Sequence, residues 1–275
     1  MEHFHIDTEK CISCGQCAAN CPVRIISMND GIPVLVRQKE QFCIGCMHCF
    51  AICSEGAVSL FGQTPSPDNA FDKNKLPTAE QMKHLLGGRR SIRSYQDRNM
   101  DAEVIQDLLD TAWQAPTGRN VRELLFTVID DKAVLASVRE DLLEGIEKRV
   151  ADESLGEIYG EFAKFPHVWK EYGYDVLFRG APHCLIVSAP KNAPTPAQDA
   201  SIALATFDLY AQAQGIGTVW NGIAKIAMTD LVPEIRERFC IPEDHDIYSV
   251  MCFGHSAVRY KQLVSRGLAR VQRVE

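Results

Sequence analysis

The sequence predicts an α+β fold in two domains, and three observations carry this prediction. With 275 residues, the chain is long enough for one or two domains and at least one buried core. Of its 11 cysteines, all but three fall between Cys11 and Cys53. Beyond residue 78, helical and strand patterns are mixed without strict alternation, which favours α+β over a doubly wound sheet. The cysteine-rich segment is therefore expected to form a small module of its own.

The cysteine-rich segment is an internal repeat. Its first half carries Cys11, Cys14, Cys17 and Cys21, and its second half, 32 residues on, carries Cys43, Cys46, Cys49 and Cys53. A repeat of this kind predicts two like halves related by a pseudo-twofold axis. In a C-x2-C-x2-C run, three thiolates wrap one face of a cuboidal iron–sulfur cluster, and the fourth cysteine ligates the other cluster. We therefore assign one cluster to Cys11, Cys14, Cys17 and Cys53, and its partner to Cys43, Cys46, Cys49 and Cys21.

Two other uses of these cysteines are weaker interpretations. Disulfides need an oxidising compartment that nothing in the sequence indicates, and zinc sites prefer separated pairs of cysteines. Residues 1–62 resemble a bacterial two-cluster ferredoxin over the whole module, with two 4Fe-4S clusters as the implied cofactors. In one departure, Ser54 replaces the proline that often follows the fourth cysteine. So short a module lacks a sufficient core, and its folding is expected to depend on the metal. His48, inside the second loop, is either an unusual ligand or, as we expect because four thiolates are already available, a solvated neighbour of the cluster.

A polar linker, residues 63–78, separates this module from a second domain at 79–275. There Thr78 and Gln81 form a capping-box pattern that opens a helix ending at Gly87-Gly88. Periodicity and caps predict the remaining elements: an amphipathic helix over 104–113 after a cap at Asp101, a strand over 124–129, a helix over 131–150, a strand over 184–188, a buried helix over 200–214 and a strand over 247–253.

Three cysteines and six aromatic residues of this domain can be explained by packing in an apolar core. Cys184, Cys240 and Cys252 lie in apolar settings, where free cysteine acts as a small hydrophobe. Phe162, Phe165, Trp169, Tyr172, Tyr174 and Phe178 either pack in the core or form a lid that stacks planar substrates.

Composition and missing motifs exclude several classes of function. The net charge of -7 argues against nucleic-acid binding and against a polybasic membrane surface. No apolar run is long enough to span a membrane, and the N-terminus lacks a signal-peptide pattern, so we expect a cytoplasmic protein. Gly215-Ile-Gly217 lacks the third glycine of a dinucleotide fingerprint, and neither a zinc-protease nor a serine-hydrolase motif is present.

The segment Arg89-Arg90-Ser91-Ile92-Arg93 could grip a phosphate, since arginine binds phosphate with two parallel hydrogen bonds. Alone, such a run is more often a solvated face. Three later segments raise the phosphate interpretation: Ala115-Pro-Thr-Gly-Arg-Asn120, Gly215-Ile-Gly-Thr-Val-Trp-Asn-Gly222 and Tyr260-Lys-Gln-Leu-Val-Ser-Arg266. In this order and spacing, residues 79–270 resemble the FMN-dependent nitroreductase family, and the whole chain is similar to nitroreductases that carry an N-terminal ferredoxin module.

The resemblance implies an FMN-binding sheet with surrounding helices, and a role for particular residues. The family's loop that contacts the FMN phosphate and ribityl chain is matched here by Arg89, Arg90, Ser91 and Arg93. Arg266 matches the arginine that completes the phosphate site, Asn120 matches an asparagine on the flavin ring, and the backbone of Gly222 and Ile223 matches the turn at flavin N5. Family members are homodimers with FMN at the interface, so Arg266 or Asn120 would act on the partner's flavin.

Two departures from the family concern the site. Val121-Arg122-Glu123 replaces Gln-Pro-Trp after Asn120, and Gly254-His255-Ser256 replaces Gly-Tyr-Pro. The first exchanges an apolar wall for charge, and the second changes the course of the C-terminal segment.

From the module and the resemblance together, we expect an oxidoreductase that passes electrons from two clusters to FMN and on to a small electron-poor acceptor such as a nitroaromatic. The donor would be a ferredoxin-type protein or NAD(P)H. No side chain is an obvious proton donor, so the catalytic apparatus is the flavin with the Gly222 backbone. Two alternatives stay open: an electron relay to a protein partner, and another flavin reduction, of an enone or a carbon–halogen bond.

Overall fold

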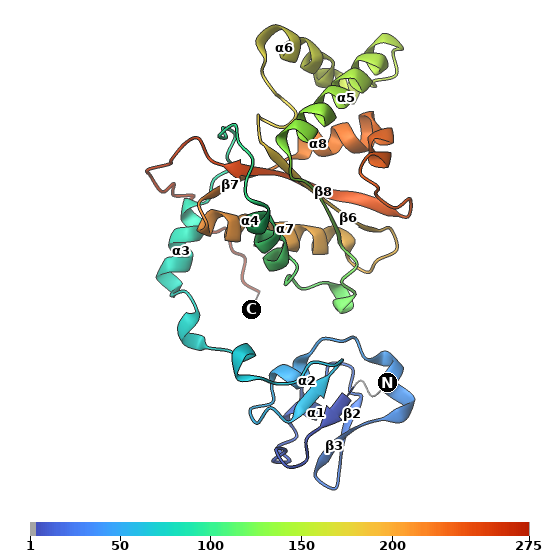
Figure 1. Cartoon of the computed structure of the whole chain (residues 1–275), viewed down its shortest axis with the longest axis vertical. Coiled ribbons are helices and arrows are strands. Elements are labelled where there is room, and N and C mark those ends of the chain that lie inside the picture. The colour runs from blue at the N-terminus through green and yellow to red at the C-terminus, as the bar shows by residue number, and fades with distance from the viewer. Residues whose placement is uncertain (1–3, 275) are drawn as a thin grey trace. The chain divides into compact units, whose positions relative to one another are not determined.

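The computed structural model describes residues 4–274, and the chain divides into two compact units, Met1–Pro77 and Thr78–Glu275 (Figure 1). The first unit, which contains the cysteine repeat, has two small antiparallel sheets, one of β1 (Phe4–Ile6) with β4 (Val58–Leu60), the other of β2 (Ile26–Asn29) with β3 (Ile32–Leu35). Two short helices, α1 (Gln16–Ala19) and α2 (His48–Ala51), follow the cysteine loops 32 residues apart, as the repeat predicts.

The first unit has little apolar core. Its buried cluster consists of a few aliphatic side chains packed with cysteines, namely Cys17, Cys21, Ile25, Ile26, Cys49, Val58 and Leu60. A 3-10 helix, η1 (Arg37–Phe42), leads into the second cysteine loop. The chain then passes two more 3-10 turns, η2 (Pro67–Asn69) and η3 (Lys73–Lys75), before the second unit.

The second unit begins with α3 (Ala79–Gly88), and the predicted capping box is present in full. The Thr78 hydroxyl accepts from the Gln81 amide at 3.2 Å, and the Gln81 side chain accepts from the Thr78 amide at 2.8 Å. The helix therefore begins and ends where the sequence predicts.

A four-stranded antiparallel sheet forms the centre of the second unit, in the order β5-β6-β8-β7. The strands are β5 (Leu125–Ile129), β6 (His183–Pro190), β7 (Ile216–Trp220) and β8 (His245–His255). Both faces of the sheet are buried, since Cys184 and Ile186 join one apolar cluster whereas Leu185 and Val187 join another. This explains why the central strands read as continuous apolar runs rather than as alternating ones.

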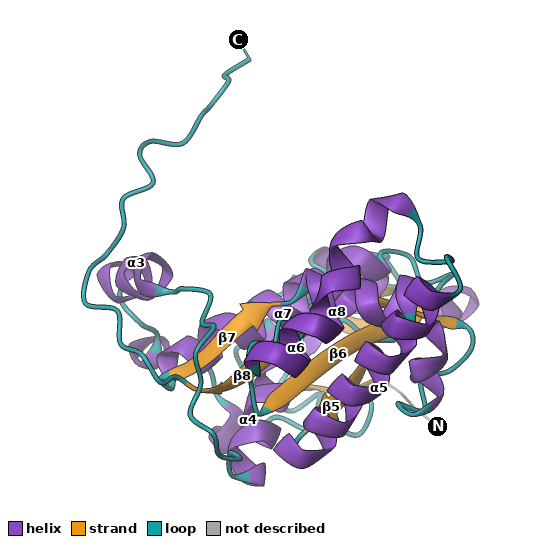
Figure 2. Cartoon of the chain, turned by 90° about the horizontal axis from the view of Figure 1, so that it is seen from above, coloured by secondary structure: helices purple, strands orange, loops and turns teal. Residues whose placement is uncertain are grey.

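Helices cover both faces of this sheet (Figure 2). On one face lie α4 (Ala102–Ala112) and α7 (Pro196–Ala213), and on the other α5 (Lys132–Ala151), α6 (Phe165–Tyr172) and α8 (Gly222–Ile226). Short helices complete the unit: η4 (Gly118–Asn120), η5 (Glu157–Lys164), the π-helix η6 (Ala227–Leu231) and η7 (Pro233–Glu237). Beyond β8, an exposed tail runs away from the sheet (Figure 2). The α+β prediction is confirmed.

Three smaller predictions, on the cap at Asp101, the three separate cysteines and the aromatic stretch, are wrong in part. Asp101 occupies the N-cap of α4, but its side chain makes no capping hydrogen bond. Cys184 and Cys252 are buried as predicted, whereas Cys240 is exposed in a left-handed turn with φ 52°, so its assignment as a small hydrophobe is wrong. Of the aromatic stretch, Phe162 and Phe178 are buried and Phe165 and Trp169 pack partly against the core, but Tyr172 and Tyr174 are exposed. No helix within residues 4–274 has the length and apolar character needed to cross a membrane.

Candidate functional site

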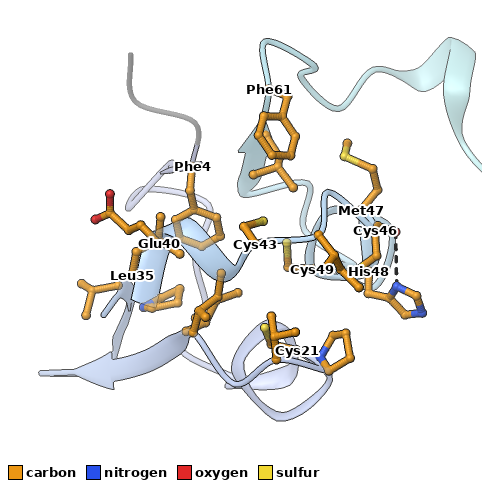
Figure 3. A pocket seen from close by; sticks show the side chains of 18 of the residues that line it. Phe4, Cys21, Leu35, Glu40, Cys43, Cys46, Met47, His48, Cys49 and Phe61 are labelled. Carbon is orange, nitrogen blue, oxygen red and sulfur yellow. Dashed lines mark hydrogen bonds between the residues drawn. The ribbon is translucent and has the colours of Figure 1, made fainter. Parts of the chain in front are cut away.

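Each predicted set of four cysteines lines a cavity of its own. Cys21, Cys43, Cys46 and Cys49 surround a cavity of about 670 Å³, with Phe4, Leu35, Met47 and Phe61 among the other lining residues (Figure 3). Cys11, Cys14, Cys17 and Cys53 line a much smaller cavity of about 20 Å³. The structure thus brings the fourth cysteine of each half to the loop of the other half.

Left-handed residues shape the two cysteine loops. In the first loop Ser13 and Gly15 have φ 60° and 71°, and in the second Gly45 and Met47 have φ 61° and 59°. Each pair turns the loop back on itself before the third cysteine enters a short helix. Met47 adopts a conformation that a bulky residue rarely takes, and its side chain lines the larger cavity.

The chemistry of these thiols suits iron. Burial raises the pKa of Cys49 to about 11 and raises that of Cys17 above its ordinary value. Such thiols keep their protons near neutral pH, and metal binding would release them. Within residues 4–274 no three His, Cys, Asp or Glu side chains close around a single ion. Each cavity is lined by four cysteines, which is the number and kind of ligand that a 4Fe-4S cluster requires, so both donor sets fit a cluster.

Cys53 and two residues beside the cysteines, His48 and Ser54, make polar contacts with nearby residues. His48 Nδ1 lies 3.2 Å from the Cys46 carbonyl oxygen, on the exposed surface. Cys53 Sγ accepts from the Ala57 amide at 3.2 Å. Ser54, which stands in the place of a proline, donates its hydroxyl to Glu55.

In the second unit, the arginine loop that follows α3 is fastened to the edge strand β7. The Ile92 amide donates to the Thr218 carbonyl at 2.8 Å, and Ser91 forms a parallel bridge with Thr218. The Ile92 side chain packs directly onto Gly217, where an added Cβ would lie 2.8 Å from Ile92 Cγ1. Glycine at this point of the G-x-G motif therefore allows the loop to approach the sheet.

Arg90 has one unused donor in this loop. Its NH1 donates to the carbonyls of Gly87 and Arg89, both at 2.7 Å, and so closes the C-terminus of α3. Its NH2 is buried and has no hydrogen-bond partner within residues 4–274. An orphaned guanidinium donor beside two more arginines, Arg89 and Arg93, is a donor set that fits a phosphate.

The Asn120 loop is held by the first turn of α7. The Gly118 amide donates to the buried Asp199 carboxylate at 2.9 Å, and the Thr195 hydroxyl donates to the same oxygen at 2.8 Å. Arg119, Asn120 and Arg122 all have positive φ, from 53° to 57°. This backbone costs of order 1–3 kcal/mol per residue, so it persists only where its surroundings determine it.

Gly222 and Ile223 form the first turn of α8. Asn221 caps this helix by accepting from the Ala224 amide at 2.9 Å, and it is itself held by the Leu177 carbonyl, to which it donates at 2.8 Å. The backbone N–H groups in the first turn of a helix have no carbonyl acceptor within that helix, and Gly222 and Ile223 lie in this turn. Two backbone N–H groups therefore stand at the end of β7, next to the sheet edge that carries the arginine loop.

Arg266 lies apart from these contacts, in the exposed tail. Leu263, three residues earlier, lies over α3, where its Cδ2 would be 3.9 Å and 3.8 Å from a Cβ added at Gly87 and at Gly88. Among the described residues, no hydrogen bond or ion pair links Arg266 to the arginine loop.

Sequence reasoning missed the two buried carboxylates that support these loops. Asp199 and Asp208 are each 4% exposed, in a helix whose pattern is mostly apolar. Asp208 pairs with Arg89, with Oδ2 at 3.4 Å from NH1. The signal was available in part, because an acidic residue in a buried apolar helix requires a partner.

Fold and site together define a class: an oxidoreductase in which a cysteine-rich iron–sulfur module precedes a sheet covered by helices on both faces. Comparison with known proteins agrees. The nitroreductase family model matches residues 86–255, and a model described as a 4Fe-4S dicluster domain matches residues 10–58. The chain belongs to the nitroreductase family.

Curated relatives and solved structures are consistent with this membership. A Methanothermobacter thermautotrophicus protein named for NADH dehydrogenase/NAD(P)H nitroreductase activity is 31% identical over 173 residues, 62% of this chain and 74% of the relative. A 4-nitrobenzoate reductase of Nocardioides sp. is 26% identical over 67% of this chain and 84% of its own. In fold, the chain resembles FMN-bound nitroreductases of Bacteroides fragilis (TM-score 0.56, 21% identity, 70% of this chain and 99% of that one) and Desulfitobacterium hafniense (TM-score 0.55, 21% identity, 71% and 100%).

Proposed function

We propose that the protein is an iron–sulfur flavoprotein that passes electrons from two 4Fe-4S clusters to FMN and on to a small electron-poor acceptor, such as a nitroaromatic. One observation carries this proposal. A single chain of the nitroreductase family holds two sets of four cysteines, each lining its own cavity, together with an arginine loop fastened to the sheet. When bound, FMN would supply the conversion of single electrons into a hydride or an electron pair, which clusters cannot perform.

The chain's own residues would bind and orient the flavin. Three arginines and a serine of the loop, Arg89, Arg90, Ser91 and Arg93, would hold the phosphate and ribityl chain; the orphaned NH2 of Arg90 supports this role. Asn120 would hydrogen-bond the ring, and the first-turn amides of Gly222 and Ile223 would face flavin N5, where a fixed donor stabilises developing negative charge.

The assembly we propose is a homodimer with FMN at the interface. Arg266 stands in an exposed tail that carries apolar side chains, including Leu268, which is 98% exposed. Such a tail is suited to lie on a second copy, where Arg266 would complete the phosphate site of the partner's flavin. The clusters would be ligated by the two crossed sets of cysteines described above, and the electron donor would be a ferredoxin-type protein or NAD(P)H.

The test is cofactor content followed by turnover. After anaerobic purification, we expect about eight iron atoms and one FMN per chain. With reduced ferredoxin or NAD(P)H as donor, the holoprotein should reduce 4-nitrobenzoate, the substrate named for one relative. Iron without flavin would contradict the phosphate loop. Full cofactors without turnover of any small nitroaromatic, enone or halogenated acceptor would favour an electron relay to a protein partner.

A further inference from the structure

Asp208 is a buried carboxylate in the middle of an apolar helix. It lies in α7 and is 4% exposed, and most of its buried neighbours on that helix are alanine, leucine and phenylalanine. A charge in such a position is costly unless it is paired and hydrogen-bonded. Both carboxylate oxygens of Asp208 have partners, so the cost is met locally.

The partners of Asp208 come from two segments. Two belong to β7: the Thr218 hydroxyl donates to Oδ1, and Trp220 Nε1 donates to Oδ2 at 3.3 Å. The third is Arg89, whose NH1 lies 3.4 Å from Oδ2. Arg89 is the first residue of the arginine loop, and the carbonyl of Thr218 also accepts from the Ile92 amide of that loop. The carboxylate thus joins the helix, the edge strand and the loop at one point.

The two donors from β7 give each carboxylate oxygen a hydrogen bond, and Arg89 supplies the opposite charge that a buried carboxylate requires. The pair with Arg89 adds a constraint on a flexible side chain that is 27% exposed. Because the contact uses one nitrogen of the guanidinium, the rest of the fork stays open for a second acceptor. A fixed guanidinium loses less conformational freedom when it binds an anion.

We propose that Asp208 is a positioning residue that holds Arg89 in the orientation required to bind the phosphate of FMN. This inference rests on the proposed function, and it deepens that function by assigning the selectivity for the phosphorylated flavin to a residue outside the binding loop. It implies that Asp208 contributes to FMN binding and not to binding of riboflavin, which has the same ring and ribityl chain but no phosphate.

The variant Asp208→Asn isolates the charge. An asparagine can still accept from Trp220 and can donate its amide N–H to the Thr218 hydroxyl oxygen, so both contacts with β7 keep a hydrogen bond while the negative charge that faces Arg89 is lost. We expect the Kd for FMN, titrated against the apoflavin protein with its clusters intact, to rise about fivefold to tenfold. The Kd for riboflavin should stay unchanged.

A matched control is Asp175→Asn. Asp175 is also buried and also faces an arginine, with Oδ2 at 3.5 Å from Arg139 NH1, but it contacts none of the proposed flavin residues. Its substitution should lower stability and leave the ratio of the FMN and riboflavin Kd values as in the wild type. Tryptophan fluorescence monitors folding, since all three tryptophans lie in the second unit.

If Asp208→Asn weakens both flavins by the same factor, or neither, its role is structural and the inference is overturned. Should that variant fail to fold, Arg89→Gln removes the same ion pair from its exposed side, and an unchanged ratio of Kd values there overturns the inference too. A wild-type protein that binds neither flavin contradicts the proposed function itself, and the inference with it.

Discussion

The contact between Gly217 and Ile92 offers a direct test of how the arginine loop is held. In the variant Gly217→Ala, the new Cβ would lie 2.8 Å from Cγ1 and Cγ2 of Ile92 and 2.9 Å from its Cβ. Carbon atoms pack at about 3.5–4.0 Å, so the loop must retreat by about 0.7 Å or more. Ile92 is 5% exposed and its amide donates to Thr218 at 2.8 Å, so it cannot retreat without straining that hydrogen bond.

We expect Gly217→Ala to lower the free energy of unfolding of the second unit by about 2 kcal/mol, within the usual range for overpacking. Displacement of the loop should also weaken FMN binding by about tenfold. Urea unfolding followed by tryptophan fluorescence and FMN titration measure the two effects. In the double variant Gly217→Ala/Ile92→Ala, removal of the opposing side chain should make the combined cost at least about 1 kcal/mol smaller than the sum of the single costs.

Gly145→Ala is the matched control for this variant. In α5 an added Cβ would lie 2.6 Å from Val232 Cγ2, a comparable clash with a residue outside the arginine loop. It should alter stability without altering FMN affinity. The reasoning is refuted if Gly217→Ala binds FMN as the wild type does, or if the two costs at Gly217 and Ile92 are strictly additive.

Three further predictions concern other parts of the chain. Burial lowers the pKa of His183 and of His255 below the ordinary 6.5, so both side chains favour the neutral form in the folded state. The stability that they contribute is therefore complete above pH 6.5 and declines as the pH falls below it. A urea midpoint that stays constant from pH 7 to pH 5 would contradict this. Cys53→Ser should reduce bound iron from about eight to about four atoms per chain, whereas the exposed Cys240→Ser should leave the iron content intact, as iron and sulfide assays would show. Thr78→Ala should cost about 1 kcal/mol through loss of the capping box, and an unchanged urea midpoint would mean that α3 begins independently of its cap.

The sequence was informative where a local pattern has a local physical cause. Cysteine spacing grouped the thiols because a short loop can wrap only one cluster, and the Thr78 box predicted the start of α3 because capping involves neighbours in sequence. Contacts between distant segments were not predictable. Asp208 and Arg89 are far apart in the chain, and a helical pattern does not reveal what faces a single buried carboxylate. Cys240 was misjudged because its apolar neighbours conceal a left-handed turn.

The loop after Asn120 shows how a departure from the family pattern can be accommodated. Arg122 stands where an apolar wall is usual, yet it is not a loose charge: its NH2 donates to the Trp113 carbonyl at 2.6 Å and its guanidinium lies 5.0 Å from the centre of the Trp113 ring. Its amide donates to the Thr117 hydroxyl at 3.0 Å, which secures the positive φ of the turn. The chain therefore replaces an apolar wall with a packed cation over an aromatic ring. Under the proposed function, this cation, two residues beyond Asn120, would lie near the flavin ring and would affect which acceptors bind there, while the fold of the loop is kept.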